Sequence, residues 1–302
     1  MRPPGGGQGR DRDRDRDFGR NKGQGRNQGK GRGGGQGRQR GRGGPHWRAG
    51  EEGGTPGGEQ VEGRRAVREL LVARRRRTRD VWLSQGLDAS PLLVEITDLA
   101  AEQRVPVRTV TKERLDAAAR TSAPQGVLAH ADPLPEAELD DLVRAYAGAT
   151  PPFLLVLDGI TDPHNLGALM RTAECAGATG VVVPAHRAAL VTPTVAKVAA
   201  GAIEHLPVAV ESSIPSVLAR LGRAGVWTVG LDADAEGALG ELALGSEPVA
   251  LVLGSEGRGL SRLARERCDV VVAIPRHGAL ESLNVAAAGA VACFEVARRR
   301  SG

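Results

Sequence analysis

Apolar residues recur with helical and strand spacing from Val61 to the end of the chain. In the second half of the chain, six short apolar runs alternate with segments of helical periodicity, and these runs are 153–158, 180–183, 207–210, 226–231, 248–253 and 269–274. Short buried strands separated by helices are typical of a largely parallel sheet that is covered on both faces. We therefore expect an α/β domain over 151–302 that ends in a long helix over 283–300.

An earlier segment, 61–131, shows the same kind of alternation on a smaller scale. Its helical patterns cover 65–72, 92–103 and 112–119, and its strand patterns cover 80–84, 106–110 and 126–130. A segment of about 70 residues suits a small α/β domain. The run Asp132-Pro-Leu-Pro breaks the pattern, and an amphipathic helix is predicted over 136–147. We expect 132–150 to form a linker and a bridging helix.

The first 60 residues have a different composition from the rest. They hold 21 of the 42 glycines and 14 Lys and Arg against 7 Asp and Glu, a net charge of +7. A segment with so few aliphatic residues buries too little apolar surface to offset the entropy of ordering, so we expect 1–60 to be disordered. A Gly/Arg-rich tail attracts RNA phosphates without reading sequence, although it also serves as a solvated solubility tail.

Cysteine and histidine usage favours a reduced protein without a metal site. The three cysteines, Cys175, Cys268 and Cys293, are far apart in the chain, and the six histidines form no pair at helical spacing. We expect buried thiols. The chain has no apolar run of 18 residues and does not open on a signal peptide, so we expect a cytoplasmic protein with no membrane partner.

The first candidate for chemistry is the polar run that follows the strand at 153–158. Gly159 and Pro163 are turn residues, and Asn165 and Arg171 lie six residues apart where the turn becomes a helix. Ligands of α/β sheets bind where strands end and helices begin. An Asn at a helix start also serves as a simple cap, and both interpretations stay open for this residue taken alone.

Two later loops also follow predicted strands. The run Gly254-Ser-Glu-Gly-Arg-Gly has glycines in the order G-x-x-G-x-G, which is neither a dinucleotide fingerprint nor a phosphate-binding loop. Its Glu256 is either a functional carboxylate or a turn carboxylate stabilised by a helix dipole. The run Ile274-Pro is followed by Ser282-Leu283-Asn284, where Ser282 and Asn284 either orient a ligand or cap the last helix.

Together the three segments resemble the SpoU/TrmH family of RNA ribose 2′-O-methyltransferases, in the SPOUT superfamily. The resemblance covers nearly all of residues 153–300, and its motifs are Asn165, Gly167 and Arg171, then 254–259, then Ile274-Pro with 282–285. The leading domain is similar to the ribosomal-protein-like RNA-binding domain of the RlmB branch, which methylates a guanosine ribose in 23S rRNA. Where that branch often carries His-Gln-Gly, this chain has Pro124-Gln125-Gly126.

The resemblance implies S-adenosylmethionine as methyl donor, a homodimer, and a trefoil knot in the second domain. It also implies roles for the motif residues. Gly254, Ile274 and Leu283 would surround the methyl donor, and the polar shell around the acceptor ribose and its phosphate would comprise Asn165, Arg171, Glu256, Ser282 and Asn284. The family assigns the arginine matching Arg171 as general base, but a guanidinium has a pKa above about 12. We therefore expect Arg171 to fix the phosphate as a cationic clamp.

The run Arg74-Arg75-Arg76-Arg77, with Arg79, closes the first helix of the leading domain. These cations either grip rRNA phosphates or stabilise the helix dipole without a partner. The leading hypothesis for the chain is methylation of rRNA. The alternatives are the same chemistry on tRNA or on an antibiotic-resistance site of rRNA, and a non-catalytic RNA-binding or ribosome assembly factor, against which the five polar motif residues argue.

Overall fold

The computed structural model describes residues 58–144, 151–186, 189–243, 247–280 and 282–301. The tail expected over 1–60 therefore lies almost wholly outside the described residues. Of that tail, only 58–60 can be compared, and Gln60 already begins a strand, β1 (Gln60–Glu62). Regular structure thus reaches further toward the N-terminus than expected, because a strand of three residues is too short to show a period in the sequence.

The leading segment, 58–131, contains a four-stranded mixed sheet in the order β1-β4-β2-β3, in which β2 and β3 are parallel and the other pairs antiparallel. Helices α1 and α2 pack on one of its faces through a cluster of aliphatic residues. All six predicted elements are present, and their bounds are α1 (Arg64–Ala73), β2 (Thr78–Ser84), α2 (Pro91–Glu102), β3 (Val107–Val110), α3 (Lys112–Ala118) and β4 (Val127–Ala131).

The second segment, 151–301, contains a seven-stranded sheet in the order β7-β6-β5-β10-β8-β11-β9, and every neighbouring pair in it is parallel. The parallel α/β prediction is therefore confirmed. The strands are β5 (Phe153–Asp158), β6 (Gly180–Pro184), β7 (Val208–Glu211), β8 (Trp227–Leu231), β9 (Gly237–Ala238), β10 (Val249–Gly254) and β11 (Val270–Ala273). The two-residue strand β9 is the one element of this sheet that periodicity did not predict.

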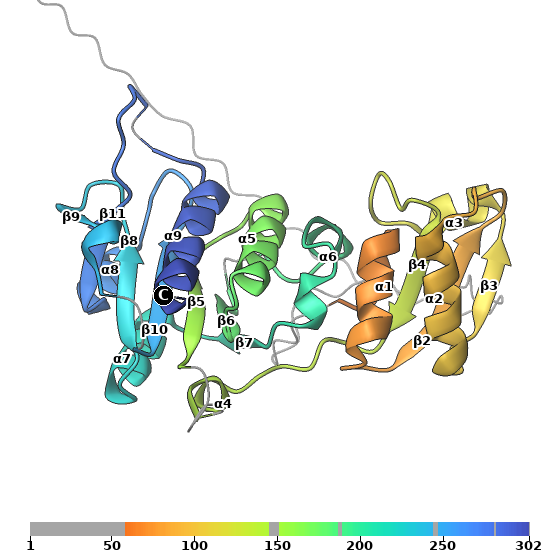
Figure 1. Ribbon diagram of the computed structural model, residues 1–302, viewed down its shortest axis with the longest axis horizontal. Helices are drawn as coiled ribbons and strands as arrows, with labels where there is room; N and C mark the ends of the chain where they lie inside the picture. The colour runs from red at the N-terminus through yellow and green to blue at the C-terminus, as the bar shows by residue number, and fades with distance from the viewer. Residues whose placement is uncertain (1–57, 145–150, 187–188, 244–246, 281, 302) are drawn as a thin grey trace, which may run out of the picture. The chain divides into compact units, whose positions relative to one another are not determined.

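Helices cover both faces of this sheet, and the alternation along β5 shows how. Leu155 and Leu157 point to the face covered by α5, α6 and α9, whereas Leu154 and Val156 point to the face covered by α4, α7 and α8. Figure 1 shows α5 and α9 side by side on the first face. The bounds are α4 (Leu139–Arg144), α5 (Pro163–Cys175), α6 (Pro193–Val198), α7 (Ile214–Arg223), α8 (Arg262–Arg267) and α9 (Val285–Arg300), with 3₁₀ turns at Ala202–Glu204 and Leu239–Glu241.

The strand order explains why this fold makes a site. β5 and β10 are neighbours in the sheet although about a hundred residues separate them in the chain, and the connections leave them toward opposite sides. Because the strands are parallel, their carboxyl ends lie at the same edge of the sheet. The three polar runs follow β5, β10 and β11, so all three begin at this edge.

Three expectations from the sequence need correction. The bridging helix expected over 136–147 is present only as α4, beginning at Leu139, and residues 145–150 lie outside the described part. The last helix begins at Val285 rather than 283, because Asn284 is its N-cap. Cys175 is exposed, whereas burial raises the pKa of the Cys293 thiol to about 12. Across the described residues, no helix has both the length and the apolarity needed to span a membrane.

Candidate active site

Three side chains, one from each polar run, form a closed set of hydrogen bonds at the carboxyl edge of the main sheet. The Asn165 Nδ2 donates to Glu256 Oε2 over 3.0 Å, and the Asn284 Nδ2 donates to Asn165 Oδ1 over 3.0 Å. The same Asn284 nitrogen lies 3.3 Å from Glu256 Oε1. Loops that are up to 119 residues apart in the chain therefore meet at one carboxylate, as the sequence predicted.

Helix capping accounts for only part of this arrangement. The N-cap of α5 is Asp162, which accepts from the amides of the next residues, so Asn165 lies inside the helix and is 8% exposed. Its amide is therefore free for Glu256. Asn284 does cap α9, because its Oδ1 accepts from Ala286 N, and its Nδ2 is at the same time the donor to the other two members of the set. The capping interpretation of Asn284 is therefore confirmed, and its role toward a ligand stays a prediction.

The loop that carries Glu256 is closed on itself. Ser255 and Gly259 exchange both backbone hydrogen bonds, at 3.0 and 2.9 Å, and the Asp158 carboxylate at the end of β5 accepts from Ser261 N at 2.7 Å. A Cβ at Gly254 would overlap the Gly259 carbonyl carbon, so the loop folds this tightly only over a glycine. The tight turn holds the Glu256 backbone in place beside Asn165 and Asn284.

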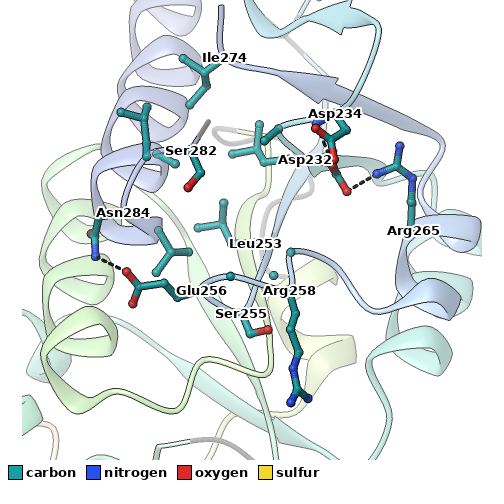
Figure 2. Close-up of a pocket in the computed structure, with 18 of the residues that line it drawn as sticks. Asp232, Asp234, Leu253, Ser255, Glu256, Arg258, Arg265, Ile274, Ser282 and Asn284 are labelled. Atoms are coloured by element: carbon teal, nitrogen blue, oxygen red, sulfur yellow. Dashed lines mark hydrogen bonds and ion pairs between the residues drawn. The ribbon is translucent and has the colours of Figure 1, made fainter. Parts of the chain in front are cut away.

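A hollow of about 580 Å³ opens beside these side chains. Gly254, Ile274, Ser282 and Leu283 line it, as does Glu256. Figure 2 shows Glu256 and Asn284 on one side of the hollow and the Asp232–Arg265 pair on the opposite side. Its size is in the range of sites that enclose a cofactor, and its walls combine apolar side chains with backbone from the tight loop.

Two family models match separate parts of the chain. The model of the SpoU rRNA methylase family matches residues 152–294, and the model described as RNA 2′-O ribose methyltransferase substrate binding matches residues 60–137. A 23S rRNA (guanosine-2′-O-)-methyltransferase RlmB from Pseudomonas putida is 41% identical over 245 residues, which are 80% of this chain and 97% of the relative. The chain belongs to the SpoU rRNA methylase family. It is an RNA 2′-O-ribose methyltransferase that depends on S-adenosylmethionine.

Other similar proteins agree with this placement. A putative TrmH family tRNA/rRNA methyltransferase YacO from Bacillus subtilis is 38% identical over 244 residues and covers 80% of this chain and 96% of its own length. Among solved structures, the SpoU methyltransferase AviRb from Streptomyces viridochromogenes in complex with the cofactor AdoMet has a TM-score of 0.66 at 25% identity. That match covers 80% of this chain and 91% of AviRb, so the two-segment architecture is shared.

The hollow of this SpoU family member fits S-adenosylmethionine. Leu253, Ile274 and Leu283 offer apolar surface, and Gly254 and other residues of the tight loop also line the hollow. An adenosyl group needs apolar walls and backbone hydrogen-bonding groups, and both are present. In the described part of the chain, no cluster of His, Cys, Asp and Glu has the arrangement of a metal site.

The opposite wall holds residues that sequence reasoning missed. Asp232 directly follows β8, its carboxylate accepts from Asp234 N at 2.9 Å, and it pairs with Arg265. Partial burial alone raises the pKa of the Asp232 carboxyl, but the Asp234 amide and the Arg265 guanidinium together bring this pKa below its usual value. Asp232 could have been found from the sequence, because it directly follows a predicted strand, and the three motifs were identified by the same kind of position.

Arg171 lies elsewhere within this chain. Residues six apart on a helix are about 9 Å apart along its axis and about 120° apart around it, so α5 cannot present Asn165 and Arg171 to one point. Arg171 lines a second hollow together with residues of α1 and α6. Gly167, also in the first motif, is a packing residue, because a Cβ there would lie 2.7 Å from Val198 Cβ and 2.9 Å from the Val195 carbonyl oxygen.

The basic run of the leading segment is used inside the protein. Both carboxylate oxygens of Glu204 accept from Arg76, at 2.5 and 3.0 Å, and these side chains are 1% and 2% exposed. Arg75 donates to the Leu206 carbonyl oxygen at 2.9 Å. The interpretation of this run as a grip on rRNA is therefore wrong for Arg75 and Arg76, and Arg74 and Arg79 form exposed ion pairs.

Proposed function

We propose that this protein transfers a methyl group from S-adenosylmethionine to the ribose 2′-hydroxyl of a guanosine in 23S rRNA. The observation that carries the proposal is the set of hydrogen bonds among Asn165, Glu256 and Asn284 at the rim of the hollow that fits the methyl donor. The substrate is supported by the relatives named as 23S rRNA (guanosine-2′-O-)-methyltransferases, of which the chain covers nearly the whole length.

The roles of these residues follow from their geometry. Bound S-adenosylmethionine supplies an electrophilic methyl group. Gly254, Ile274 and Leu283 hold the donor through backbone groups and apolar contact. Glu256 accepts one hydrogen bond at each oxygen from the two asparagines, which fixes the carboxylate plane and leaves lone pairs directed at the acceptor ribose. Such positioning lowers the barrier because the hydroxyl oxygen must lie in line with the methyl group.

Asn165 and Ser282 differ in what they can reach. Asn165 is buried behind Glu256, so we assign it as a positioning residue that acts through the carboxylate. Ser282 lines the hollow and is exposed, so its hydroxyl is available to the ribose or the donor. A guanidinium group offers hydrogen-bond donors and no acceptor, so we propose that Arg171 holds a phosphate of the substrate rather than taking the proton of the 2′-hydroxyl.

We also infer how the chain is organised and assembled. The two sheets and the two separate family models support a substrate-binding domain over 61–131, a linker over 132–150 and a methyltransferase domain over 151–302. We also propose a trefoil knot in the methyltransferase domain, as the resemblance to the SPOUT superfamily implies, and tracing the chain between β11 and α9 in an experimental density map would test it.

A homodimer is the proposed assembly. Val291 and Phe294 lie one turn apart on α9 and are 48% and 51% exposed, an apolar surface on the last helix of the domain. Exposed apolar patches of this kind mark protein interfaces. Light scattering of the protein and of a Phe294→Asp variant tests this, since the variant should be monomeric. With rRNA as substrate, we propose that the protein acts in the cytoplasm.

Mapping ribose methylation over all rRNA and tRNA, in cells with and without the gene, tests the proposed substrate. We expect loss of methylation at a single 23S rRNA guanosine, restored by the wild-type gene but not by Glu256→Gln. Loss at a tRNA position or at a different rRNA nucleotide would replace the proposed substrate while keeping the chemistry. Unchanged methylation everywhere, together with defective ribosome assembly, would favour the non-catalytic alternative.

A further inference from the structure

The second hollow, of about 600 Å³, is lined by cations from both segments of the chain. Arg64 and Arg65 come from the first turn of α1, Lys197 from α6 and Arg171 from α5. It is distinct from the hollow that fits the methyl donor, because the residues that line the two are different.

No acidic group in its lining is available to neutralise these cations. Glu62, the one carboxylate that lines the hollow, is fully buried and accepts from Gln60 Nε2, from Arg120 N and from the amide and hydroxyl of Thr121. Both carboxylate oxygens of Glu62 therefore already accept hydrogen bonds from residues that do not line the hollow. Four cationic side chains thus surround one hollow, and the single carboxylate in its lining is already hydrogen-bonded. This arrangement creates a positive potential that attracts an anion.

Three of the four cations are also unengaged. Within the described residues, no hydrogen bond or ion pair involves the side chains of Arg65, Arg171 or Lys197, and Arg65 and Arg171 are exposed. Arg64 differs, since its Nε donates to the Gln125 carbonyl oxygen at 3.3 Å, which holds it at the rim. The cations of the hollow differ in this respect from the Arg74–Arg77 run, in which Arg74, Arg75 and Arg76 bind other groups of the protein.

The position of Arg171 connects this hollow to the reaction. Arg171 lies on α5 about 9 Å along the helix axis from Asn165, which holds Glu256. Residues of α5 thus border both the candidate acceptor site and this hollow, which is also lined by residues of the leading segment. Guanidinium and ammonium groups are the usual partners of RNA phosphates, and contacts to phosphates position a nucleic acid without reading its sequence.

We infer that this hollow binds backbone phosphate groups of the RNA substrate that flank the nucleotide to be methylated, with Arg65 and Lys197 as phosphate contacts. The inference rests on the proposed function, because it takes the anion to be the RNA that is methylated. The leading segment then contributes to binding through the first turn of α1, at the end of that helix opposite the Arg74–Arg77 run.

A pair of charge-matched double variants tests the inference. Arg65→Gln with Lys197→Gln removes two cations from the hollow. Arg77→Gln with Arg267→Gln removes two cations that are exposed and unpartnered in the described structure but lie outside the hollow. The probe is unmodified, transcribed 23S rRNA, and its Kd is measured over a series of salt concentrations. The Kd for S-adenosylmethionine is measured by calorimetry on the same proteins.

The hollow variant should raise the Kd for the transcript on the order of tenfold relative to the control variant, with an unchanged Kd for S-adenosylmethionine. The slope of log Kd against log salt should fall by about 1.4 to 1.8, since each phosphate contact contributes about 0.7 to 0.9. A single charge reversal in the hollow, Lys197→Glu, should also weaken RNA binding more than Arg267→Glu does. Equal effects of the hollow and control variants would overturn the inference.

The same experiment separates this inference from the proposed function. If the wild-type protein binds the transcript but transfers no methyl group to a guanosine, the proposed substrate is wrong, and the comparison of variants still decides whether the hollow binds phosphates. If the wild-type protein methylates the transcript and the hollow variant binds and methylates like the control, the function stands and the hollow is not a phosphate site.

Discussion

Replacing Glu204 by glutamine should destabilise the protein strongly, although Glu204 lies in neither hollow. Its carboxylate and the Arg76 guanidinium are 1% and 2% exposed and form two hydrogen bonds. The third donor of Arg76, its Nη1, binds the carbonyl oxygens of Gly58 and Asp132, at 2.6 and 2.7 Å. The guanidinium therefore joins three separate parts of the chain, and the carboxylate is the one group that neutralises it.

The expected cost follows from leaving that charge buried. Breaking a buried ion pair by removing one partner costs about 3 to 5 kcal/mol, because the remaining charge has neither a counterion nor water. The Glu204→Gln side chain keeps the shape but not the charge, and its amide group faces the donors of Arg76. The matched control is Glu102→Gln, whose partner Arg74 is 56% exposed. An exposed pair of this kind contributes about 0 to 1 kcal/mol.

Urea denaturation, followed by the fluorescence of Trp82 in the leading segment and Trp227 in the second, measures the difference. With a slope of about 2 to 3 kcal/mol per molar urea, Glu204→Gln should lower the midpoint by about 1 to 2.5 M and Glu102→Gln by about 0.5 M at most. Adding Arg76→Met to the Glu204 variant should recover part of the loss. If the two single variants shift the midpoint equally, the reasoning about the buried charge is refuted.

Three further predictions concern the methyl-donor site. Asn284→Asp keeps the cap of α9 but loses the donor to Glu256. The rate of methyl transfer should therefore fall about 100-fold, while the melting temperature changes by less than about 3 °C. A large fall in both the rate and the melting temperature would contradict the view that capping and positioning of Glu256 are separate roles of Asn284. Gly254→Ala should weaken S-adenosylmethionine binding at least about tenfold by calorimetry, because the added Cβ overlaps Gly259 and opens the loop. The pKa of Asp232 lies below its usual value of about 3.9, so its carboxylate stabilises the fold above about pH 4 and this contribution is lost as the pH falls through the folded-state pKa. The melting temperatures of wild type and Asp232→Asn should therefore differ at pH 7 and converge as the pH falls well below 4, and a constant difference would refute this assignment.

The sequence predicted the main sheet well because burial on both faces leaves a simple signal. All six expected strand ranges begin within one residue of an observed strand. Strands of two or three residues are too short to show a repeated alternation, which explains why β1 and β9 were missed. The predicted start of a helix depends on which residue caps it. Ser282 and Asn284 are equally good caps by residue type, so only the structure could assign the cap of α9 to Asn284.

The candidate site could be predicted as a set of loops but not as a set of distances. Asn165, Glu256 and Asn284 were expected together and are in contact. Arg171 was expected with them on grounds of motif order, yet a helix turns its residues to different sides, and six residues do not return to the same side. The role of Arg76 in the Arg74–Arg77 run could not be predicted, because its partner Glu204 is distant in the sequence and is brought near only by the fold.

Helix α5 therefore links two chemically different places. Its first turn holds Asn165 against Glu256, at the edge where β5 and β10 end, and its third turn carries Arg171, which lines the basic hollow. Because a Cβ at Gly167 would collide with Val198 and Val195, this glycine lets α6, which carries Lys197, pack directly on α5. With the roles proposed for Glu256 and the basic hollow, α5 sets the distance between the reacting ribose and the phosphates that flank it. We therefore expect the enzyme to select its nucleotide in part by the spacing between a phosphate in the hollow and the 2′-hydroxyl at Glu256.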